Sequence, residues 1–291
     1  MFETAINILN IIENRGYKAY IVGGYIRDKL LNIDSNDIDL CTNATPEQLA
    51  SIFSDNISLN SYGSCRLLFN GYNYEITTFR EDNTYIKNRK PSSVSYVNTI
   101  EKDVLRRDFT INSLYMDKDK NIIDLLGAKE DINNRIIKSI GDPYIRLEED
   151  SLRILRAIRF SCVLNFNIDK ELEKAIISKK HLIKNISHQR KKEELEKIYN
   201  SDNYKLGFYL INKYNMCDEL GFTFNNIKKT KNIIGLWAQL DFKEDYEFSK
   251  IDKNKINNVK EIINYGKIDE YILSKYSQEE IIISSEIINE G

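Results

Sequence analysis

The sequence predicts an α+β fold, with a mixed sheet and helices in the first 140 residues and helices alone after them. Two observations predict this division. Short β-branched apolar runs alternate with helical patterns up to about residue 140, whereas strand signals nearly vanish beyond Pro143. The prolines at positions 46, 91 and 143 all fall at expected element edges. A chain of 291 residues is long enough for about two or three domains.

The first segments alternate between helix and strand. Residues 2–12 carry apolar side chains at the helical period, and residues 19–24 are a β-branched run that ends in two glycines. Residues 25–31 have helical character, and residues 37–42 predict a second strand.

Capping and turn signals set the next boundaries. The stretch TPEQ at residues 45–48 predicts a helix start, with threonine as the N-cap, proline in the first turn and glutamine reaching back. Two apolar runs flank Gly71 and predict a hairpin. The polar segment 81–91 predicts a mobile loop, residues 92–97 a further strand, and residues 101–117 a helix over part of their length.

Helical signals dominate the rest of the chain. Asp142 predicts an N-cap, with Pro143 at the first helical position. Successive helices are expected at residues 151–160, 170–180 and 189–199. The remaining residues have helical patterns with weak boundaries and carry no motif.

The composition argues against several classes of protein. A net charge of −2 gives no overall sign of nucleic-acid binding, so any basic surface must be local. The four cysteines contain no C-x-x-C pair and predict reduced thiols of a cytoplasmic protein, and with only two histidines they predict no zinc site. Charges interrupt every long apolar stretch, and the N-terminus lacks the pattern of a signal peptide. We therefore expect neither a membrane span nor secretion.

Two aspartates, Asp37 and Asp39, stand one residue apart in an expected strand. On a strand they point to the same face, where their carboxylates repel each other unless a cation lies between them. Either the strand end is solvated, or the pair binds a divalent metal together with phosphate. Glu75, on a strand of the expected hairpin, could supply a third carboxylate. Two metal ions held in this way can activate a hydroxyl and stabilise leaving pyrophosphate.

Two further motifs could hold a phosphate and a sugar. A strand, the pair Gly23-Gly24 and a helix can bring a phosphate to backbone N–H groups, and Arg27 could reach the same anion. A tight turn with a surface arginine is the alternative. In the stretch RRDFTIN, Arg107 and Asp108 could contact a ribose hydroxyl and a phosphate, the arginine by donating hydrogen bonds and the aspartate by accepting them. An internal salt bridge is the alternative.

The segment 148–160 predicts one helix with a basic face. Glu149 and Asp150 lie four and three residues before Arg153, so either acid can share a helical face with it. Arg153, Arg156 and Arg159 follow one another at three-residue spacing and form a basic stripe. A solvated face with salt bridges is the alternative.

The pair Asp150 and Arg153 permits a sharper hypothesis about bases. Cytosine and adenine each present an exocyclic amine beside a ring nitrogen that accepts, whereas guanine and uracil present the reverse pattern. A carboxylate can accept from the amine while a guanidinium donates to the ring nitrogen. One such pair could therefore admit C and A and reject G and U, so that the protein itself acts as the template.

Six spaced motifs over residues 18–198 resemble the class II tRNA nucleotidyltransferases, which are the bacterial CCA-adding enzymes and their poly(A) polymerase relatives. The motifs are GGYIRD, DIDLCTNATPEQL, YEITTFR, RRDFTIN, GDPYIRLEEDSLRILRAIRF and ISHQRKKEELEKI. The resemblance implies a polymerase-beta-like nucleotidyltransferase head with a mixed sheet at residues 1–140. It also implies an all-helical neck for base recognition at 141–200 and a shortened helical body and tail for tRNA binding at 201–291.

The resemblance also implies a role for each candidate residue. Asp37 and Asp39 would bind two Mg²⁺ ions, with Glu75 as the supporting catalytic acid. The segment 81–91 would be the flexible loop that helps the switch from C to A addition. The residues implied to bind the nucleotide are Gly24, Arg27, Arg107, Asp108, Asp150, Arg153, Arg156 and Arg159. Among them, Gly24 would hold the triphosphate together with Arg27.

The implied activity is template-independent addition of C and A to the 3′ end of tRNA from CTP and ATP, with release of pyrophosphate. Basic residues between Lys179 and Lys192 could contact tRNA phosphates, or could be a solvated helical face. Gln189 stands where the family usually has glutamate. The stretch YGSCRLLFNG lacks the basic segment typical of the poly(A) polymerase branch, which favours CCA addition.

Three alternatives stay open at this point. The first is a poly(A) or A-only polymerase, and the second is a non-catalytic RNA-binding protein on the same fold. The third is a small-molecule nucleotidyltransferase, which would share the glycine pair and D-x-D but would not need the arginine helix. No protein partner and no membrane partner are expected.

Overall fold

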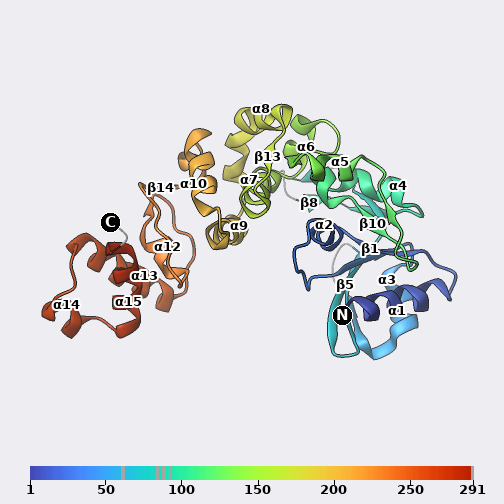
Figure 1. Cartoon of the computed structure of the whole chain (residues 1–291), viewed down its shortest axis with the longest axis horizontal. Coiled ribbons are helices and arrows are strands. Elements are labelled where there is room, and N and C mark those ends of the chain that lie inside the picture. The colour runs from blue at the N-terminus through green and yellow to red at the C-terminus, as the bar shows by residue number, and fades with distance from the viewer. Residues whose placement is uncertain (60–62, 83–84, 87–89, 92, 290–291) are drawn as a thin grey trace. The chain divides into compact units, whose positions relative to one another are not determined.

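The computed structural model describes residues 1–59, 63–82, 85–86, 90–91 and 93–289 (Figure 1). The chain divides into two compact units. The first comprises residues 1–150 and 166–175, and the second comprises residues 151–165 and 176–291. The division into head, neck and body at residues 140 and 200 stays a prediction.

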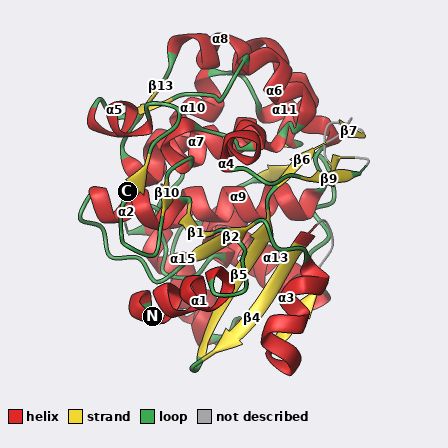
Figure 2. Cartoon of the chain, turned by 90° about the vertical axis from the view of Figure 1, so that its right-hand side faces the viewer, coloured by secondary structure: helices red, strands yellow, loops and turns green. Residues whose placement is uncertain are grey.

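A mixed sheet organises the first unit, as the sequence predicts. Within the described residues it has seven strands in the order β11-β10-β1-β2-β5-β4-β3. The strands are β1 (Ala19–Val22), β2 (Asp39–Thr42), β3 (Ile57–Leu59), β4 (Ser64–Phe69), β5 (Tyr72–Thr78), β10 (Tyr115–Met116) and β11 (Ile122–Ile123). The pair β2 and β5 runs parallel, and the other neighbours run antiparallel. Figure 2 shows β1, β2, β5 and β4 side by side.

The first unit also contains helices. They include α1 (Phe2–Glu13), α2 (Gly24–Leu30), α3 (Pro46–Phe53), α4 (Ile100–Asp103), α5 (Ala128–Asn133) and α6 (Pro143–Glu149). Helix α1 packs against β1, and α3 packs against β3 and β4. The apolar face of α1, including Ile8, Leu9 and Ile12, is fully buried. Burial of such a stripe, rather than intrinsic propensity, supplies most of a short helix's stability.

Local signals place several boundaries where the sequence predicts them. Thr45 and Gln48 form a capping box at the start of α3, and Asp142 accepts from the Tyr144 N–H at the start of α6. Asn70 and Gly71 connect β4 to β5 with φ angles of 49° and 80°. Two consecutive positive φ angles are those of the type I′ hairpin turn, which favours Asn-Gly.

The segment predicted to be a mobile loop contains short strands. Strand β6 (Arg80–Asp82) pairs with β9 (Val94–Tyr96), which confirms the strand expected at 92–97. Strand β7 (Tyr85–Ile86) pairs with β8 (Lys90–Pro91). The loop prediction is therefore wrong for these described residues, because backbone pairing satisfies their polar groups. Residues 83–84 and 87–89 lie outside the described residues.

The predicted helix at 148–160 is two helices. Helix α6 ends at Glu149, Asp150 is extended with φ −134° and ψ 100°, and α7 covers Leu152–Leu164. Aspartate and serine hydrogen-bond to nearby backbone outside helices, so Asp150-Ser151 suits a break better than a helix interior. The helical expectation for 101–117 holds in part, because α4 is followed by the 3₁₀ turns η3 (Val104–Arg106) and η4 (Thr110–Asn112).

The second unit is mostly helical, as expected. Its helices include α7, α9 (His188–Asn200), α10 (Tyr204–Lys213), α11 (Cys217–Leu220), α12 (Ile234–Ala238), α13 (Lys250–Tyr265), α14 (Glu270–Lys275) and α15 (Gln278–Ile288). Helix α8 (Lys170–Lys179) begins in the first unit and ends in the second, where the 3₁₀ segment η5 (Lys180–Asn185) follows it. The parallel pair β12 (Ile136–Ile137) and β13 (Asn167–Ile168) belongs to the first unit. The sequence did not predict this pair or the pair β14 (Phe222–Thr223) and β15 (Asp241–Phe242). No helix in the described part of the chain is long and apolar enough to span a membrane.

Candidate active site

The parallel strands β2 and β5 bring two of the predicted acids together. Asp39 is the first residue of β2, and its Cα partner on β5 is Glu75. Both side chains are exposed at this edge. Asp37 lies before the strand, so the argument that both aspartates share a strand face is wrong. From the preceding loop, Asp37 is near enough for its charge to raise the pKa of Asp39.

The three acids influence one another electrostatically. The pKa of Asp39 is raised to about 6, first because the surrounding protein partly desolvates its carboxyl group and then by the charges of Asp37 and Glu75. Arg107 acts in the opposite direction. The Ser64 hydroxyl donates to Glu75 Oε1 at 2.6 Å. A cation placed among these carboxylates would relieve their repulsion.

The donors suit a hard divalent cation. Carboxylate oxygens are the ligands that Mg²⁺ prefers, and Mg²⁺ usually keeps waters and substrate phosphates as further ligands. Within the described residues no three acidic, histidine or cysteine side chains already enclose an ion position. A bound ion at Asp39 and its neighbours would therefore complete its shell with other oxygen atoms.

The glycine turn before α2 supports a buried arginine. Gly23 has a φ of 83°, which glycine adopts without strain, and Gly24 is the first residue of α2. Arg27 is only 6% exposed, so the alternative of a surface arginine is wrong. Its Nε and Nη2 donate to Asp28 Oδ1 at 2.8 and 2.6 Å, and its Nη1 donates to Asn112 Oδ1 at 2.6 Å.

Asn112 links this arginine to a second predicted residue. Asn112 Nδ2 donates to Asp108 Oδ1 at 3.2 Å, and the same oxygen accepts from the Phe109 N–H at 2.7 Å. Arg27 and Asp108, taken from two separate motifs, are thus joined through one amide. No role was predicted for Asn112, although its place in RRDFTIN was a usable signal.

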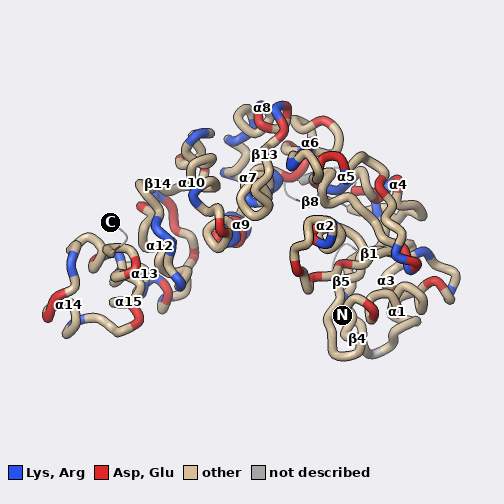
Figure 3. The backbone as a smooth tube through the Cα atoms, viewed as in Figure 1, with Lys and Arg blue, Asp and Glu red and all other residues tan. Residues whose placement is uncertain are grey.

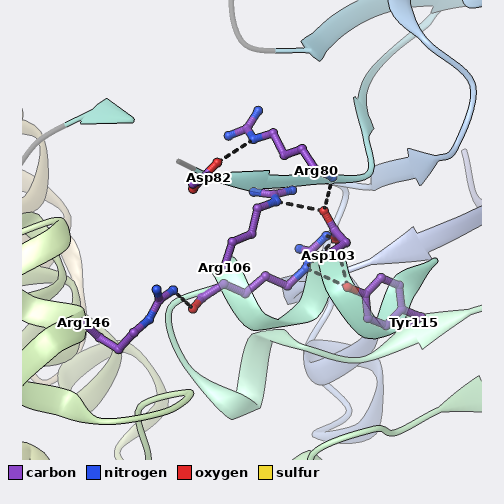
Figure 4. Close-up of polar contacts among 7 residues, drawn as sticks. Arg80, Asp82, Asp103, Arg106, Tyr115 and Arg146 are labelled. Atoms are coloured by element: carbon purple, nitrogen blue, oxygen red, sulfur yellow. Dashed lines mark hydrogen bonds and ion pairs between the residues drawn. The ribbon is translucent and has the colours of Figure 1, made fainter. Parts of the chain in front are cut away.

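Asp103 is buried at the centre of a polar cluster that the sequence did not reveal (Figure 4), and Arg107 belongs to this cluster. Asp103 Oδ2 accepts from Arg107 Nη2 at 2.8 Å and from the Tyr115 hydroxyl at 2.9 Å. Asp103 Oδ1 accepts from Arg106 Nε at 2.8 Å and from the Arg80 backbone N–H at 3.2 Å. Arg107 therefore forms an internal salt bridge, which was the alternative to a nucleotide contact. Its partner is Asp103 rather than Asp108.

Charge compensation keeps this cluster ionised. Burial alone would raise the pKa of Asp103, but Arg107 and Arg106 outweigh it and hold that pKa below its usual value. Burial alone would lower the pKa of Arg107, but Tyr115 and Asp103 outweigh it and raise that pKa. The Arg107 carbonyl also accepts from Arg146 Nη2 at 3.1 Å, a contact that Figure 4 includes.

The acids predicted beside Arg153 lie in the first unit, whereas Arg153 itself lies in the first turn of α7 in the second. The break at Asp150 removes the helical spacing on which the pairing argument depended. Glu149 forms an ion pair with Arg146, three residues before it on α6. The base-reading role of Asp150 and Arg153 stays a prediction.

The arginines of α7 have different surroundings. Arg153 is buried, and Arg156 lies over the Phe160 ring at 5.3 Å. Arg159 Nε pairs with Glu194 Oε2 on α9 at 2.6 Å, and its guanidinium lies 4.1 Å from the Phe160 ring centroid. At Arg159, the basic stripe thus forms a salt bridge, as its alternative interpretation predicted.

The basic stretch after α8 is less accessible than the sequence suggests. Lys191 is 1% exposed and donates to the Glu219 carbonyl at 3.0 Å, so a phosphate contact by Lys191 is wrong for this conformation. Lys180 donates to the Asn215 carbonyl at 2.9 Å. Gln189 donates to Glu193 Oε1 at 2.9 Å. Figure 3 shows Lys and Arg interspersed with Asp and Glu along the described chain.

Comparison with known proteins decides the family. The poly A polymerase head domain matches residues 19–138, and a probable RNA- and SrmB-binding site of polymerase A matches residues 165–220. The CCA-adding enzyme of Staphylococcus haemolyticus is 37% identical over 279 residues, which are 92% of this chain and 69% of that protein. The chain belongs to the family of CCA-adding enzymes. Members of this nucleotidyltransferase family generally use a divalent metal ion.

Two other family members define the extent of the match. The CCA-adding enzyme of Bacillus pumilus is 43% identical over 198 residues, 68% of this chain and 50% of the relative. That of Staphylococcus epidermidis is 42% identical over 209 residues, 72% of this chain and 52% of the relative. The chain thus spans about half the length of these curated family members.

Solved structures of the family have the same fold. The CCA-adding enzyme of Bacillus stearothermophilus in complex with CTP has a TM-score of 0.84 and 26% identity, over 98% of this chain and 77% of that one. The Thermotoga maritima enzyme complexed with tRNA has a TM-score of 0.74 and 19% identity, over 98% and 78%. The second likeness concerns the fold alone. Together they confirm the α+β class with a mixed-sheet head.

Proposed function

We propose that this protein adds C and A nucleotides to the 3′ end of tRNA, using CTP and ATP as substrates. The observation that carries the proposal is the register of β2 and β5, which pairs Asp39 with Glu75 in a family of CCA-adding enzymes. The tRNA 3′-hydroxyl oxygen forms a bond to the α-phosphorus of the nucleotide. The bond from that phosphorus to the β-phosphate oxygen breaks, pyrophosphate leaves with the electron pair, and the hydroxyl proton goes to solvent.

We assign Asp37 and Asp39 as the ligands of Mg²⁺, with Glu75 as the supporting acid. Bound there, the ions would supply activation of the hydroxyl and stabilisation of charge on the leaving pyrophosphate. The chain's own contribution is chiefly positioning, which can account for a large part of a rate enhancement. The raised pKa of Asp39 supports the assignment, because clustered acids whose repulsion is only partly compensated are typical of functional sites.

The other candidate residues have separate tasks in this proposal. Gly24 lets the backbone approach the triphosphate, and Arg27 supplies positive charge to it. Arg107 and Asp108 contact the ribose, and Asp150 with Arg153 select the base. Arg156 and Arg159 belong to the same nucleotide-binding helix, where the ion pair with Glu194 anchors Arg159. A cytoplasmic location is part of the proposal, and the four cysteines are free thiols.

The test uses purified protein, a tRNA that lacks its CCA end, and each labelled nucleoside triphosphate in turn. We expect incorporation from CTP and then ATP, without incorporation from GTP or UTP. Absence of C and A incorporation, or equal use of all four nucleotides, would contradict the proposal.

Two variants refine this test. Asp37→Ala should abolish transfer and leave the thermal midpoint unchanged. Asp34→Ala removes an exposed acid from the same loop and should retain activity within about twofold. An active Asp37→Ala variant would remove the metal assignment.

Addition of A alone is the second candidate, because the family model that matches residues 19–138 is that of poly A polymerase heads. A tRNA ending before its first C distinguishes the two activities. CCA addition requires CTP before ATP is used on that substrate, whereas an A-adding polymerase extends it with ATP alone.

A further inference from the structure

Asn112 lies between two residues that the proposed function assigns to the nucleotide. Its side chain is buried, with 9% exposed. It accepts from Arg27 at 2.6 Å and donates to Asp108 at 3.2 Å. The partners fix the orientation of the amide, because a guanidinium can only donate and a carboxylate can only accept.

The backbone at Asn112 is also close to the glycine turn. The Gly23 N–H donates to the Leu114 carbonyl at 3.2 Å, and a Cβ at Gly23 would lie 4.0 Å from the Asn112 carbonyl oxygen. Turn η4 and the start of α2 therefore form one connected support. A shift of Asn112 would therefore displace the part of the structure that supports Arg27.

We propose that Asn112 is a positioning residue that holds Arg27 and Asp108 in a fixed relation for one incoming nucleotide. The proposal rests on the proposed function, in which Arg27 contacts the triphosphate and Asp108 the ribose. One neutral side chain thereby connects the phosphate end of the site to its sugar end.

A neutral amide suits this place better than an acid. Arg27 is already paired with Asp28 at 2.6 Å, so a further carboxylate would leave an excess of negative charge where a polyphosphate must bind. A carboxylate at position 112 would also repel Asp108, because both groups are negatively charged. The hydrogen bond between them would be lost as well, because neither ionised group has a hydrogen to donate. The substitution Asn112→Asp keeps the shape of the side chain and changes its electrostatics.

The experiment measures KM and kcat for CTP and ATP with tRNA lacking its CCA end. We expect Asn112→Asp to raise KM for both nucleotides by about tenfold or more, through lost attraction to the phosphates. The kcat at saturating nucleotide and the affinity for tRNA should change little, which a general disruption of the fold would not give.

Thr110→Val is the matched control. It removes a hydroxyl of the same turn that donates to Asp131 Oδ2 at 2.7 Å, away from Arg27. This variant should lower the thermal midpoint and leave KM within about twofold. If Asn112→Asp fails to fold, Asn112→Ser, whose side chain is too short to reach both partners, should raise KM in its place.

Two results would overturn the proposal. One is a KM for Asn112→Asp within about twofold of the native value, since the added charge should cost about tenfold. The other is a change in KM that follows the thermal midpoint equally in the Asn112 and Thr110 variants, because this would indicate a structural role alone.

Direct titration with CTP separates this proposal from the proposed function. If the native chain binds CTP but adds nothing to tRNA, the function fails, and the ratio of dissociation constants between native and Asn112→Asp protein still decides the role of Asn112. If the native chain binds neither CTP nor ATP, both proposals are overturned.

Discussion

Two groups of acids in the first unit differ in how their charge is compensated. Asp39 and Glu75 are exposed neighbours on β2 and β5, and the pKa of Asp39 is raised to about 6 by partial desolvation of its carboxyl group and by the nearby acids. Asp103 is fully buried and accepts from Arg106 and Arg107. Although burial opposes it, these cations hold the pKa of Asp103 below its usual value.

The contrast separates a functional from a structural use of the same residue type. Asp103 has its compensating charges inside the fold, so its ionisation stabilises the chain without any ligand. For Asp39, Arg107 only partly offsets the effects of desolvation, Asp37 and Glu75, so its ionisation stays less favourable than that of an ordinary aspartate until a cation arrives. An ionised group that destabilises the free protein, but that a bound cation can stabilise, is a candidate for catalysis.

The largest expected effect is a loss of activity when Asp39, in the exposed group, is replaced. Asp39→Asn should lower nucleotide addition by about a thousandfold or more, since it removes a charged metal ligand. Its thermal midpoint should be unchanged or slightly raised, because repulsion with Glu75 is relieved. Steady-state assays and thermal melts check both parts, and a strongly destabilised Asp39→Asn would contradict the comparison.

The buried group should give the opposite result. Asp103→Asn leaves Arg106 and Arg107 without their compensating charge and should lower the free energy of unfolding by about 3 kcal/mol or more. Glu3→Gln, which breaks an exposed pair with Lys120, should cost less than about 1 kcal/mol. Urea unfolding measures both values, and similar losses in the two variants would show that burial is not decisive.

The sequence predicted those features that depend on neighbours along the chain. The capping box at Thr45, the turn at Gly71 and the cap at Asp142 each rest on a few adjacent residues. The pairing of Asp39 with Glu75 needed one additional inference, that the strands carrying them are neighbours. The family motifs then supplied the roles.

The remaining features depend on burial, which a linear pattern does not record. Asp103 precedes Arg106 and Arg107 at helical spacing, but its contact with Tyr115 arises only in the folded chain. The break at Asp150 was missed because the charge pattern continues across it. Lys191 was counted as basic surface, although it lies on the face of α9 that is buried in the second unit.

The pH dependence of stability should differ between the two groups when a chelator removes divalent ions. The pKa of Asp39 is raised from 3.8 to about 6, so the protonated form is favoured in the fold and stability falls as pH rises between these values. The pKa of Asp103 is lowered, so its contribution is present above its unfolded value of 3.8 and is lost as pH falls further.

Thermal melts of native and Asp39→Asn protein across this range check the signs. Asp39→Asn should flatten the fall in stability between about pH 4 and 6 and retain the loss at more acidic pH. An unchanged profile in the variant would show that Asp39 is not the group responsible.

The smallest expected effect concerns Ser64, the neutral side chain that contacts Glu75 in the exposed group. The Ser64 hydroxyl donates to Glu75 Oε1 at 2.6 Å and so helps to orient that carboxylate beside Asp39. Ser64→Ala should lower nucleotide addition by about twofold to fivefold and leave stability nearly unchanged, since an exposed hydrogen bond exchanges readily with water. Ser58→Ala, which removes a 3.4 Å bond to the Arg66 carbonyl in the same sheet, should leave the rate unaffected. Equal losses in the two serine variants would mean that the sheet, rather than the orientation of Glu75, limits the reaction.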